Sequence, residues 1–186
     1  MSPARLAVLL ALVTLCGCVL AQPRVLGQPQ SQLLYFQCKG TKQGQFASEG
    51  PAPRWVGWQA GLDLEFKADA PVDRATGLPT GRLQLTPLQI VRAVGPASPQ
   101  LLAALSTNEV LSQVIIHFPP GPNDSAWYEM TLYNARVVSL RQYLAPAPGE
   151  AATGPLRLLE AISLRYQRLT QRHVASGRET MVDNGP

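Results

Sequence analysis

The sequence contains few of the residues from which catalytic and metal centres are built. Its 186 residues include three cysteines and two histidines, His117 and His173. No group of Cys, His, Asp or Glu has the spacing of zinc or iron ligands, so no metal is expected. The serine nucleophile motif, the phosphate-binding loop and the dinucleotide fingerprint are also missing. The sequence therefore predicts a protein that is not an enzyme and holds no cofactor.

A pair of catalytic carboxylates is the one arrangement that sequence spacing does not reveal, because the fold alone brings such a pair together. Asp63 and Glu65 are the candidates for it. Both stand on the polar side of an alternating segment, where acidic side chains are normally solvated. We therefore expect no glycosidase-type site at these residues.

Neither sign of charge dominates the chain. Sixteen Lys and Arg residues against 12 Asp and Glu residues give a net charge of +4. The basic residues are dispersed, apart from Arg165, Arg168, Arg172 and Arg178 near the C-terminus. Nucleic-acid-binding proteins instead present a clustered basic face with interleaved aromatic residues. We expect no nucleic-acid partner and a solvated basic face near the C-terminus.

Long hydrophobic runs are missing from the body of the chain, which excludes a multispanning membrane protein. A shorter apolar run at 6–15 follows Arg5 and precedes small residues, which is the layout of a secretory signal. We expect residues 1–21 to be an export signal and residues 22–32 a flexible tether. Residues 33–182 would form the single domain and residues 183–186 a tail.

Two processing sites are predicted within the export signal. The run Leu15–Cys18 resembles a bacterial lipobox and predicts a lipid on Cys18, which would be the protein's only hold on a membrane. The small residues of Val19–Ala21 predict cleavage after Ala21 instead. In both cases the product is exported to the periplasm, the cell envelope or the medium. Cys38 is then the lone cysteine of the body, expected as a buried apolar residue.

Alternation of apolar and polar residues dominates the body. Leu62, Leu64 and Phe66 alternate with charged residues, as in a half-buried strand. Pro87 interrupts the pattern and predicts a sheet edge or a bulge. Seventeen prolines and 15 glycines favour many turns over long helices. The pattern predicts a mainly β domain, either a sandwich or a barrel.

One helix is predicted, over residues 98–108. Ser98 is a suitable N-cap, Pro99 suits the first helical turn, and three leucines, Leu101, Leu102 and Leu105, fall on one face. Residues 156–172 are ambiguous, because their apolar spacing fits both a helix and a pair of strands.

Five segments, taken in order, resemble one known family. They are residues 73–82 (Asp-Arg-Ala-Thr-Gly-Leu-Pro-Thr-Gly-Arg), 87–92, 98–105 (beginning Ser-Pro), 128–140 and 159–170. Their order and spacing resemble those of Hcp, the haemolysin-coregulated protein that forms the tube of the type VI secretion system. The resemblance covers residues 33–182, which is nearly the whole body.

The resemblance implies a fold and a function. The fold would be a mainly β, Hcp-like barrel of two sheets with one short α-helix packed on its side, and residues 156–172 would be strands. The function would be structural and non-enzymatic: protomers form hexameric rings that stack into a tube and carry small effectors. Partners would be further copies, secretion-system components or effector proteins. Such a protein would be cytoplasmic before the type VI system secretes it.

Two features depart from the family pattern. Tube proteins of the family lack an N-terminal export signal, and Gly95 stands where the family often has an acidic residue. A second function therefore stays open, namely an exported, lipid-anchored binding module that reuses the Hcp fold at the cell envelope.

The three tryptophans, Trp55, Trp58 and Trp127, are our candidates for an interface between protomers. Aromatic residues are enriched in interface cores, and a ring protomer needs such surfaces. Burial in the core of the protomer is the competing expectation.

Overall fold

Strands and one α-helix make up the part of the chain that the structure describes. A computed structural model describes residues 34–50, 52–78, 80–81, 83–121 and 124–184. The predicted signal and tether, with Cys18 and Ala21, lie outside the described residues, as do residues 185–186 of the predicted tail. The elements are β1 (Leu34–Gly40), β2 (Gly44–Gln45), the 3-10 turn η2 (Pro53–Trp55), β3 (Gln59–Gly61), β4 (Asp63–Glu65), β5 (Ala68–Asp69), β6 (Gln84–Leu85), β7 (Leu88–Ala93), α1 (Ser98–Ser106), β8 (Leu111–Phe118), β9 (Tyr128–Ala145), β10 (Arg157–Arg165), β11 (Arg168–His173) and β12 (Arg178–Asp183).

The first sheet runs in the order β2-β1-β8-β9 and continues through β11 to β12. All of its pairings are antiparallel. Phe36, Ile116 and Met130 are aligned on neighbouring strands, and all three side chains are buried in the core. Recurring buried positions along β8 and the first half of β9 place one face of these strands in the core, as the sequence predicts, whereas β12 has no buried side chain.

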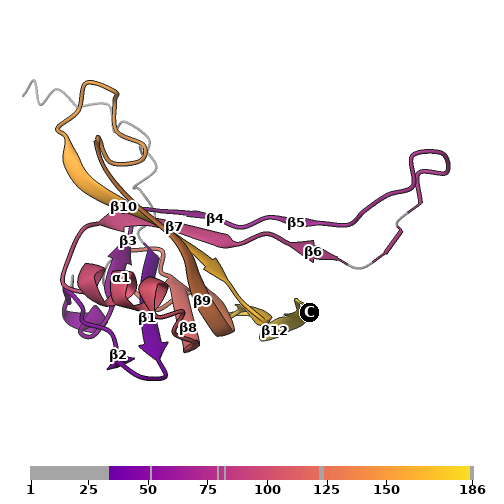
Figure 1. Cartoon of the computed structure of the whole chain (residues 1–186), viewed down its shortest axis with the longest axis horizontal. Coiled ribbons are helices and arrows are strands. Elements are labelled where there is room, and N and C mark those ends of the chain that lie inside the picture. The colour runs from indigo at the N-terminus through magenta and orange to yellow at the C-terminus, as the bar shows by residue number, and fades with distance from the viewer. Residues whose placement is uncertain (1–33, 51, 79, 82, 122–123, 185–186) are drawn as a thin grey trace, which may run out of the picture. The chain divides into compact units, whose positions relative to one another are not determined.

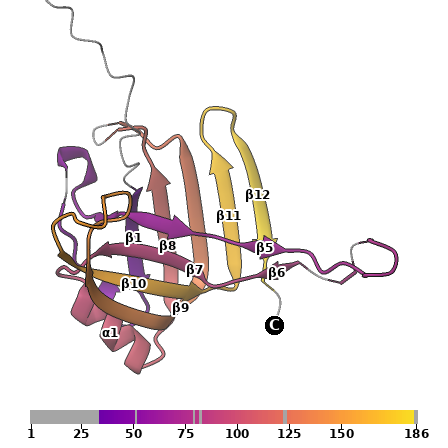
Figure 2. The same ribbon diagram turned by 90° about the horizontal axis from the view of Figure 1, so that it is seen from above.

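The second sheet begins on the same strand that ends the first, because β9 is long enough to serve both. Its first half pairs with β8 and β11, and its second half pairs with β10. Between the halves Asn134 has a φ of 50°, a left-handed conformation that asparagine tolerates. The second sheet then continues through β7 to β4, and its strands cross those of the first at a steep angle (Figure 2).

The segment β3–β4 completes a circuit of pairings around the core. Leu62 alone separates these two strands. Gln59 pairs with Phe36 of β1, and Leu64 pairs with Ile90 of β7, so one segment joins the first sheet to the second. The expected mainly β fold of two sheets with one helix is confirmed.

Helix α1 packs against β9 at one side of this circuit (Figure 1). The helix lies where the sequence predicts it, but it ends at Ser106 rather than at residue 108. Leu101 and Ala104 face the core, whereas Leu102 is 55% exposed. The prediction that Leu102 shares the buried face is therefore wrong. A helix turns 100° per residue, so adjacent leucines point in different directions.

Strands β10 and β11 occupy nearly all of residues 156–172, so the expectation of strands there is confirmed. Pro87 lies between β6 and β7, where no ladder hydrogen bond needs its missing N–H group.

A two-stranded arm (the described residues of 67–86, without 79 and 82) extends from the second sheet (Figures 1 and 2). Its strands β5 and β6 pair through Ala68 with Leu85 and Asp69 with Gln84, and they continue the β4–β7 pair outward. At the tip Asp73 accepts hydrogen bonds from the N–H groups of Ala75 and Gly77. Most described side chains of the arm are exposed, because neither face of the ribbon is covered.

Candidate functional site

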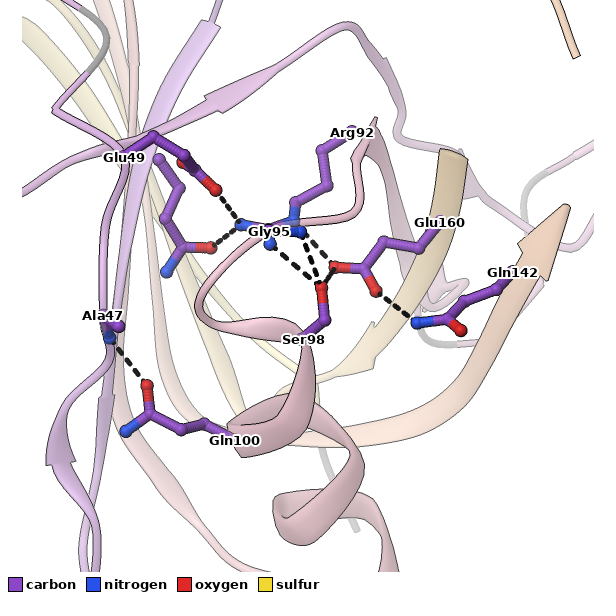
Figure 3. Close-up of polar contacts among 9 residues, drawn as sticks. Ala47, Glu49, Arg92, Gly95, Ser98, Gln100, Gln142 and Glu160 are labelled. Atoms are coloured by element: carbon purple, nitrogen blue, oxygen red, sulfur yellow. Dashed lines mark hydrogen bonds and ion pairs between the residues drawn. The ribbon is translucent and has the colours of Figure 1, made fainter. Parts of the chain in front are cut away.

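A buried ion pair joins the two inner strands of the second sheet (Figure 3). Arg92 on β7 and Glu160 on β10 stand directly opposite each other, and both side chains are fully buried. The Nε atom of Arg92 lies 2.7 Å from Oε1 of Glu160. Two charges removed from water are tolerated only when their remaining hydrogen-bonding atoms are also satisfied.

Neutral side chains provide the remaining hydrogen bonds of Arg92 and Glu160. Nη1 of Arg92 donates to Oε1 of Gln59 at 2.5 Å, and Nη2 donates to Oγ of Ser98 at 3.2 Å. The second oxygen of Glu160 accepts from Nε2 of Gln142 at 3.1 Å. This polar network (Gln59, Arg92, Ser98, Gln142 and Glu160) links β3, β7, β9 and β10 to α1. Its chemistry is that of a fixed link between elements and not that of a reacting centre.

Ser98 does not cap the helix as predicted. The N-cap residue is Ala97, and no side chain caps the N-terminus. The hydroxyl of Ser98 accepts from the N–H group of Gly95 at 3.0 Å and donates to Glu160 at 2.9 Å. A buried carboxylate is a stronger hydrogen-bond acceptor than a neutral group, so the Ser98 hydroxyl points toward Glu160 and does not bind the N–H groups of the first helical turn.

Glu49 reaches the network from the segment after β2. Its carboxylate lies 3.3 Å from Nη1 of Arg92, and its side chain is one-third exposed. A Cβ atom at Gly95 would collide with Oε1 of Glu49. Gln100 of α1 also accepts from the N–H group of Ala47 at 2.7 Å (Figure 3). Glu49 therefore brings a carboxylate close to the position where the resemblance leads us to expect an acidic residue.

Aromatic side chains cover the outer face of the first sheet beside β1 and β8. The Trp55 ring stacks on Tyr35 with centroids 4.6 Å apart, and Trp58 lies 4.5 Å from the ring of His117. Burial lowers the pKa of His117, and the opposing effect of the Glu129 carboxylate, 3.4 Å away, does not fully offset it. Trp55 is only 4% exposed, so its surface is used within the protomer.

Trp127 lies apart from this cluster and is 41% exposed. Its ring contacts those of Tyr128 and His173, with centroids 5.6 Å and 6.0 Å away. The structure thus brings Trp55 and Trp58 together, whereas the ring of Trp127 contacts Tyr128 and His173. An interface role for these three residues stays a prediction.

The candidate carboxylates Asp63 and Glu65 lie on β4 with exposed side chains. Asp63 accepts from the N–H group of its neighbour Leu64 at 2.8 Å, as a solvated turn or strand residue does. Among the described residues, no three His, Cys, Asp or Glu side chains gather in a way that could hold a metal ion. Within the same residues, no helix has the length and apolar character needed to cross a membrane.

Comparison with known proteins identifies the family. A sequence model of the family described as "Type VI secretion system effector, Hcp" matches residues 57–173, which is more than half of the chain. The chain belongs to the Hcp family. The Hcp match contains Arg92, Ser98 and Glu160, whereas Glu49 precedes it.

Relatives and solved Hcp structures agree with this assignment. The Major exported protein of Pseudomonas aeruginosa is 29% identical over 157 residues, which cover 77% of this chain and 90% of that protein. A crystal structure of an Hcp protein matches with a TM-score of 0.74 and 18% identity, covering 83% of this chain and 99% of that one. Secreted protein Hcp3 from Pseudomonas aeruginosa matches at a TM-score of 0.61 and 21% identity, over 82% and 97% of the two chains. At 18% and 21% identity, these two solved structures support the fold of the chain and not a more specific role.

Apart from Ser98, which was predicted as a helix cap, the residues of the polar network were not singled out by sequence analysis. Arg92 lies between Val91 and Ala93, and Glu160 lies between Leu159 and Ala161. A single charged residue inside an apolar strand is the local signal that could have drawn attention to each. The pairing of Arg92 with Glu160 depends on the tertiary fold and could not be predicted locally, because 68 positions separate the two residues.

Proposed function

We propose that this Hcp-family chain is a non-enzymatic protomer that assembles with copies of itself into a hexameric ring of a type VI secretion tube. Family membership supports the secretion role. The arm supports self-assembly, and it is the observation that carries the proposal.

The arm is poorly suited to an isolated protomer. Val72, Leu78 and Leu83 are 58%, 64% and 43% exposed on it. A two-stranded ribbon without a covered face is only marginally stable in water. A second copy packed against the arm removes these side chains from water and supports the ribbon, which is why we assign the arm to an interface between copies.

A closed ring also requires a second, different surface on each protomer, because head-to-tail contacts join unlike patches. We place Trp127 on this second surface, since it is the most exposed of the three tryptophans and its ring contacts residues of β9 and β11. Carriage of small effectors follows from the same assembly, because a ring encloses a lumen without needing an active site.

Light scattering of the purified protein over a range of concentrations tests the proposal. We expect a mass about sixfold that of the protomer. The variant Leu78→Gln should lower this mass, because it places an amide in the apolar contact. The matched control Leu102→Gln, at a helix position that is 55% exposed against 64% for Leu78, should leave the mass unchanged. A monomer at all concentrations, or equal behaviour of the two variants, would contradict the ring.

The second candidate function is the exported, lipid-anchored binding module. The predicted export signal at residues 1–21 favours it, since a chain exported in this way leaves the cytoplasm, where tube proteins of the family start. Mass spectrometry of the native N-terminus distinguishes a lipid on Cys18 from cleavage after Ala21. A palmitate analogue should label the unmodified protein and not Cys18→Ser if Cys18 carries the lipid. An exported monomer would favour the lipid-anchored binding module over the tube.

A further inference from the structure

Two arginines face each other without an acidic partner where the two sheets meet. Arg136 on β9 and Arg165 on β10 are directly opposed in the antiparallel register. Opposed residues leave the same face of a sheet with Cβ atoms about 5 Å apart, and like charges at this spacing are destabilising. Among the ion pairs of the described residues, none includes either arginine.

The neighbouring arginines differ in this respect. Arg168 pairs with Asp183 at 2.6 Å, and Arg172 lies 3.6 Å from Glu129. The basic residues near the C-terminus are therefore not one uniform solvated face. Arg168 and Arg172 are neutralised by carboxylates, and Arg165 instead stands beside a second positive charge.

Arg136 and Arg165 both line a pocket of about 340 Å³, together with Asn134, Gln167, Asn184 and Leu85. No carboxylate is present among these lining residues. The Nδ2 atom of Asn134 donates to Oε1 of Gln167 at 3.0 Å, which leaves the Gln167 amide nitrogen free to donate to a ligand. Arg136 is held in place through a 2.6 Å hydrogen bond from Nη1 to the carbonyl oxygen of Asn108. The pocket thus combines two positive charges with fixed hydrogen-bond donors.

We propose that this pocket binds the phosphate group of a small phosphorylated molecule. The planar guanidinium group matches phosphate oxygens with two parallel hydrogen bonds. A phosphate monoester carries close to two negative charges above about pH 7, which balances both arginines, whereas one carboxylate balances only one. The volume lies within the range of small-molecule sites, so an organic group attached to the phosphate rests beside Leu85. Leu85 is the one lining residue that belongs to the arm, so the two arginines that would hold the phosphate lie outside the proposed interface between copies.

Inorganic phosphate is the first probe. Thermal unfolding and calorimetric titration are run at about pH 8, where phosphate is a dianion, with chloride and succinate at matched ionic strength. A ligand that binds only the folded state raises the midpoint of unfolding in a saturable manner. We expect this rise with phosphate, a smaller one with succinate and none with chloride. Equal shifts for all three salts would reduce the effect to ionic strength and overturn the site.

Charge variants locate the binding. Arg165→Gln should weaken phosphate binding by about tenfold or more, which corresponds to the loss of one charge-assisted contact. In chloride its midpoint should equal or exceed that of the unmodified protein, because the opposed charges are removed. Arg178→Gln, an exposed arginine on β12, is the matched control and should bind phosphate normally. Equal binding by the two variants would overturn the proposal.

Arg165→Glu provides a second measurement. It places a carboxylate opposite Arg136, so it should abolish phosphate binding and raise the midpoint in chloride. Light scattering of this variant should match that of the unmodified protein, which separates the pocket from assembly. A variant that still binds phosphate, or whose midpoint falls in chloride, would contradict the arrangement of charges on which the site depends.

Discussion

Two ion pairs of nearly equal length lie in the body and on the arm of this molecule. Arg92 and Glu160 are 2.7 Å apart in the body, and Lys67 and Asp69 are 2.8 Å apart on the arm. The first pair is fully buried, whereas the side chains of the second are 61% and 50% exposed. Distance alone therefore says little about energy, because water screens the arm pair and leaves the body pair unscreened.

The body and the arm as a whole differ in burial in the same way as their two ion pairs. The body surrounds its charges with partners from several elements, so its stability depends on each partner. The arm has charges, turns and apolar side chains that mostly face solvent. We therefore expect the body to determine the stability of the protomer, and we propose that the arm determines its association.

The largest expected effect comes from breaking the buried pair. Arg92→Met leaves Glu160 charged and without its partner in the core. The free energy of unfolding should fall by about 3–5 kcal/mol. Urea unfolding followed by circular dichroism measures this loss.

The double variant Arg92→Met/Glu160→Leu is the control for that experiment. Two apolar side chains replace two charges, and such exchanges are often close to neutral. The double variant should therefore be much more stable than Arg92→Met alone. If both variants are equally unstable, packing rather than charge holds this part of the body.

The second effect is a loss of stability at alkaline pH that originates in the body. Cys38 is 1% exposed, and burial raises its pKa from 9.0 to about 12 although nearby Arg92 lowers it. The folded state keeps the thiol proton where the unfolded state releases it. The free energy of unfolding is thus retained below about pH 9 and falls above it by up to about 1.4 kcal/mol per pH unit.

Urea midpoints between about pH 9 and pH 11 test this dependence. Cys38→Ala should show a shallower decline with pH than the unmodified protein. A residual decline is expected from Tyr166, since burial raises the pKa of its hydroxyl to about 12 as well. Parallel curves for the two proteins would show that Cys38 is not the source.

The third effect concerns the edge of the polar network. Gly95→Ala introduces a Cβ atom into the space of the Glu49 carboxylate, which must move away from Arg92. We expect a loss of about 1–2 kcal/mol. In this background Glu49→Gln should add little, because the contact is already lost, and a double-mutant cycle of urea midpoints measures the coupling. Additive losses would mean that the two positions act separately.

The smallest effect is expected on the arm. Lys67→Gln removes the exposed pair with Asp69, and the urea midpoint should not change measurably. The same titration used for the body variants provides the measurement. A shift as large as that of Gly95→Ala would show that the arm shares the stability of the body, against the contrast drawn above.

Local patterns in the sequence predict the local structure well. Alternation identifies the strands, and the Ser98-Pro99 start places α1 at the correct residue. The role of the Ser98 side chain could not be predicted, because its preferred acceptor, Glu160, is 62 positions away. Long-range partners of buried charges are set by the register of the sheets, and no local spacing encodes that register.

The arm shows a second limit of the same kind. The alternation at Leu62, Leu64 and Phe66 is equally compatible with a strand inside the barrel and with one that leaves it. Leu64 and Phe66 pack against the core, whereas β5 just beyond them is exposed. Whether another layer covers a strand depends on the whole fold. For the same reason composition suggests tryptophans for an interface but does not show that Trp55 is buried.

The shared strand β9 has a mechanical consequence. Since its 18 residues belong to both sheets, a force applied to one sheet passes into the other along a covalent backbone. Side-chain packing alone would transmit such a load through many weak contacts. Asn134, with its left-handed backbone, lies where the pairing of this strand passes from β8 to β10, so tension passes there from one hydrogen-bonded ladder to the other. A body built in this way responds to pushing or pulling as one stiff unit.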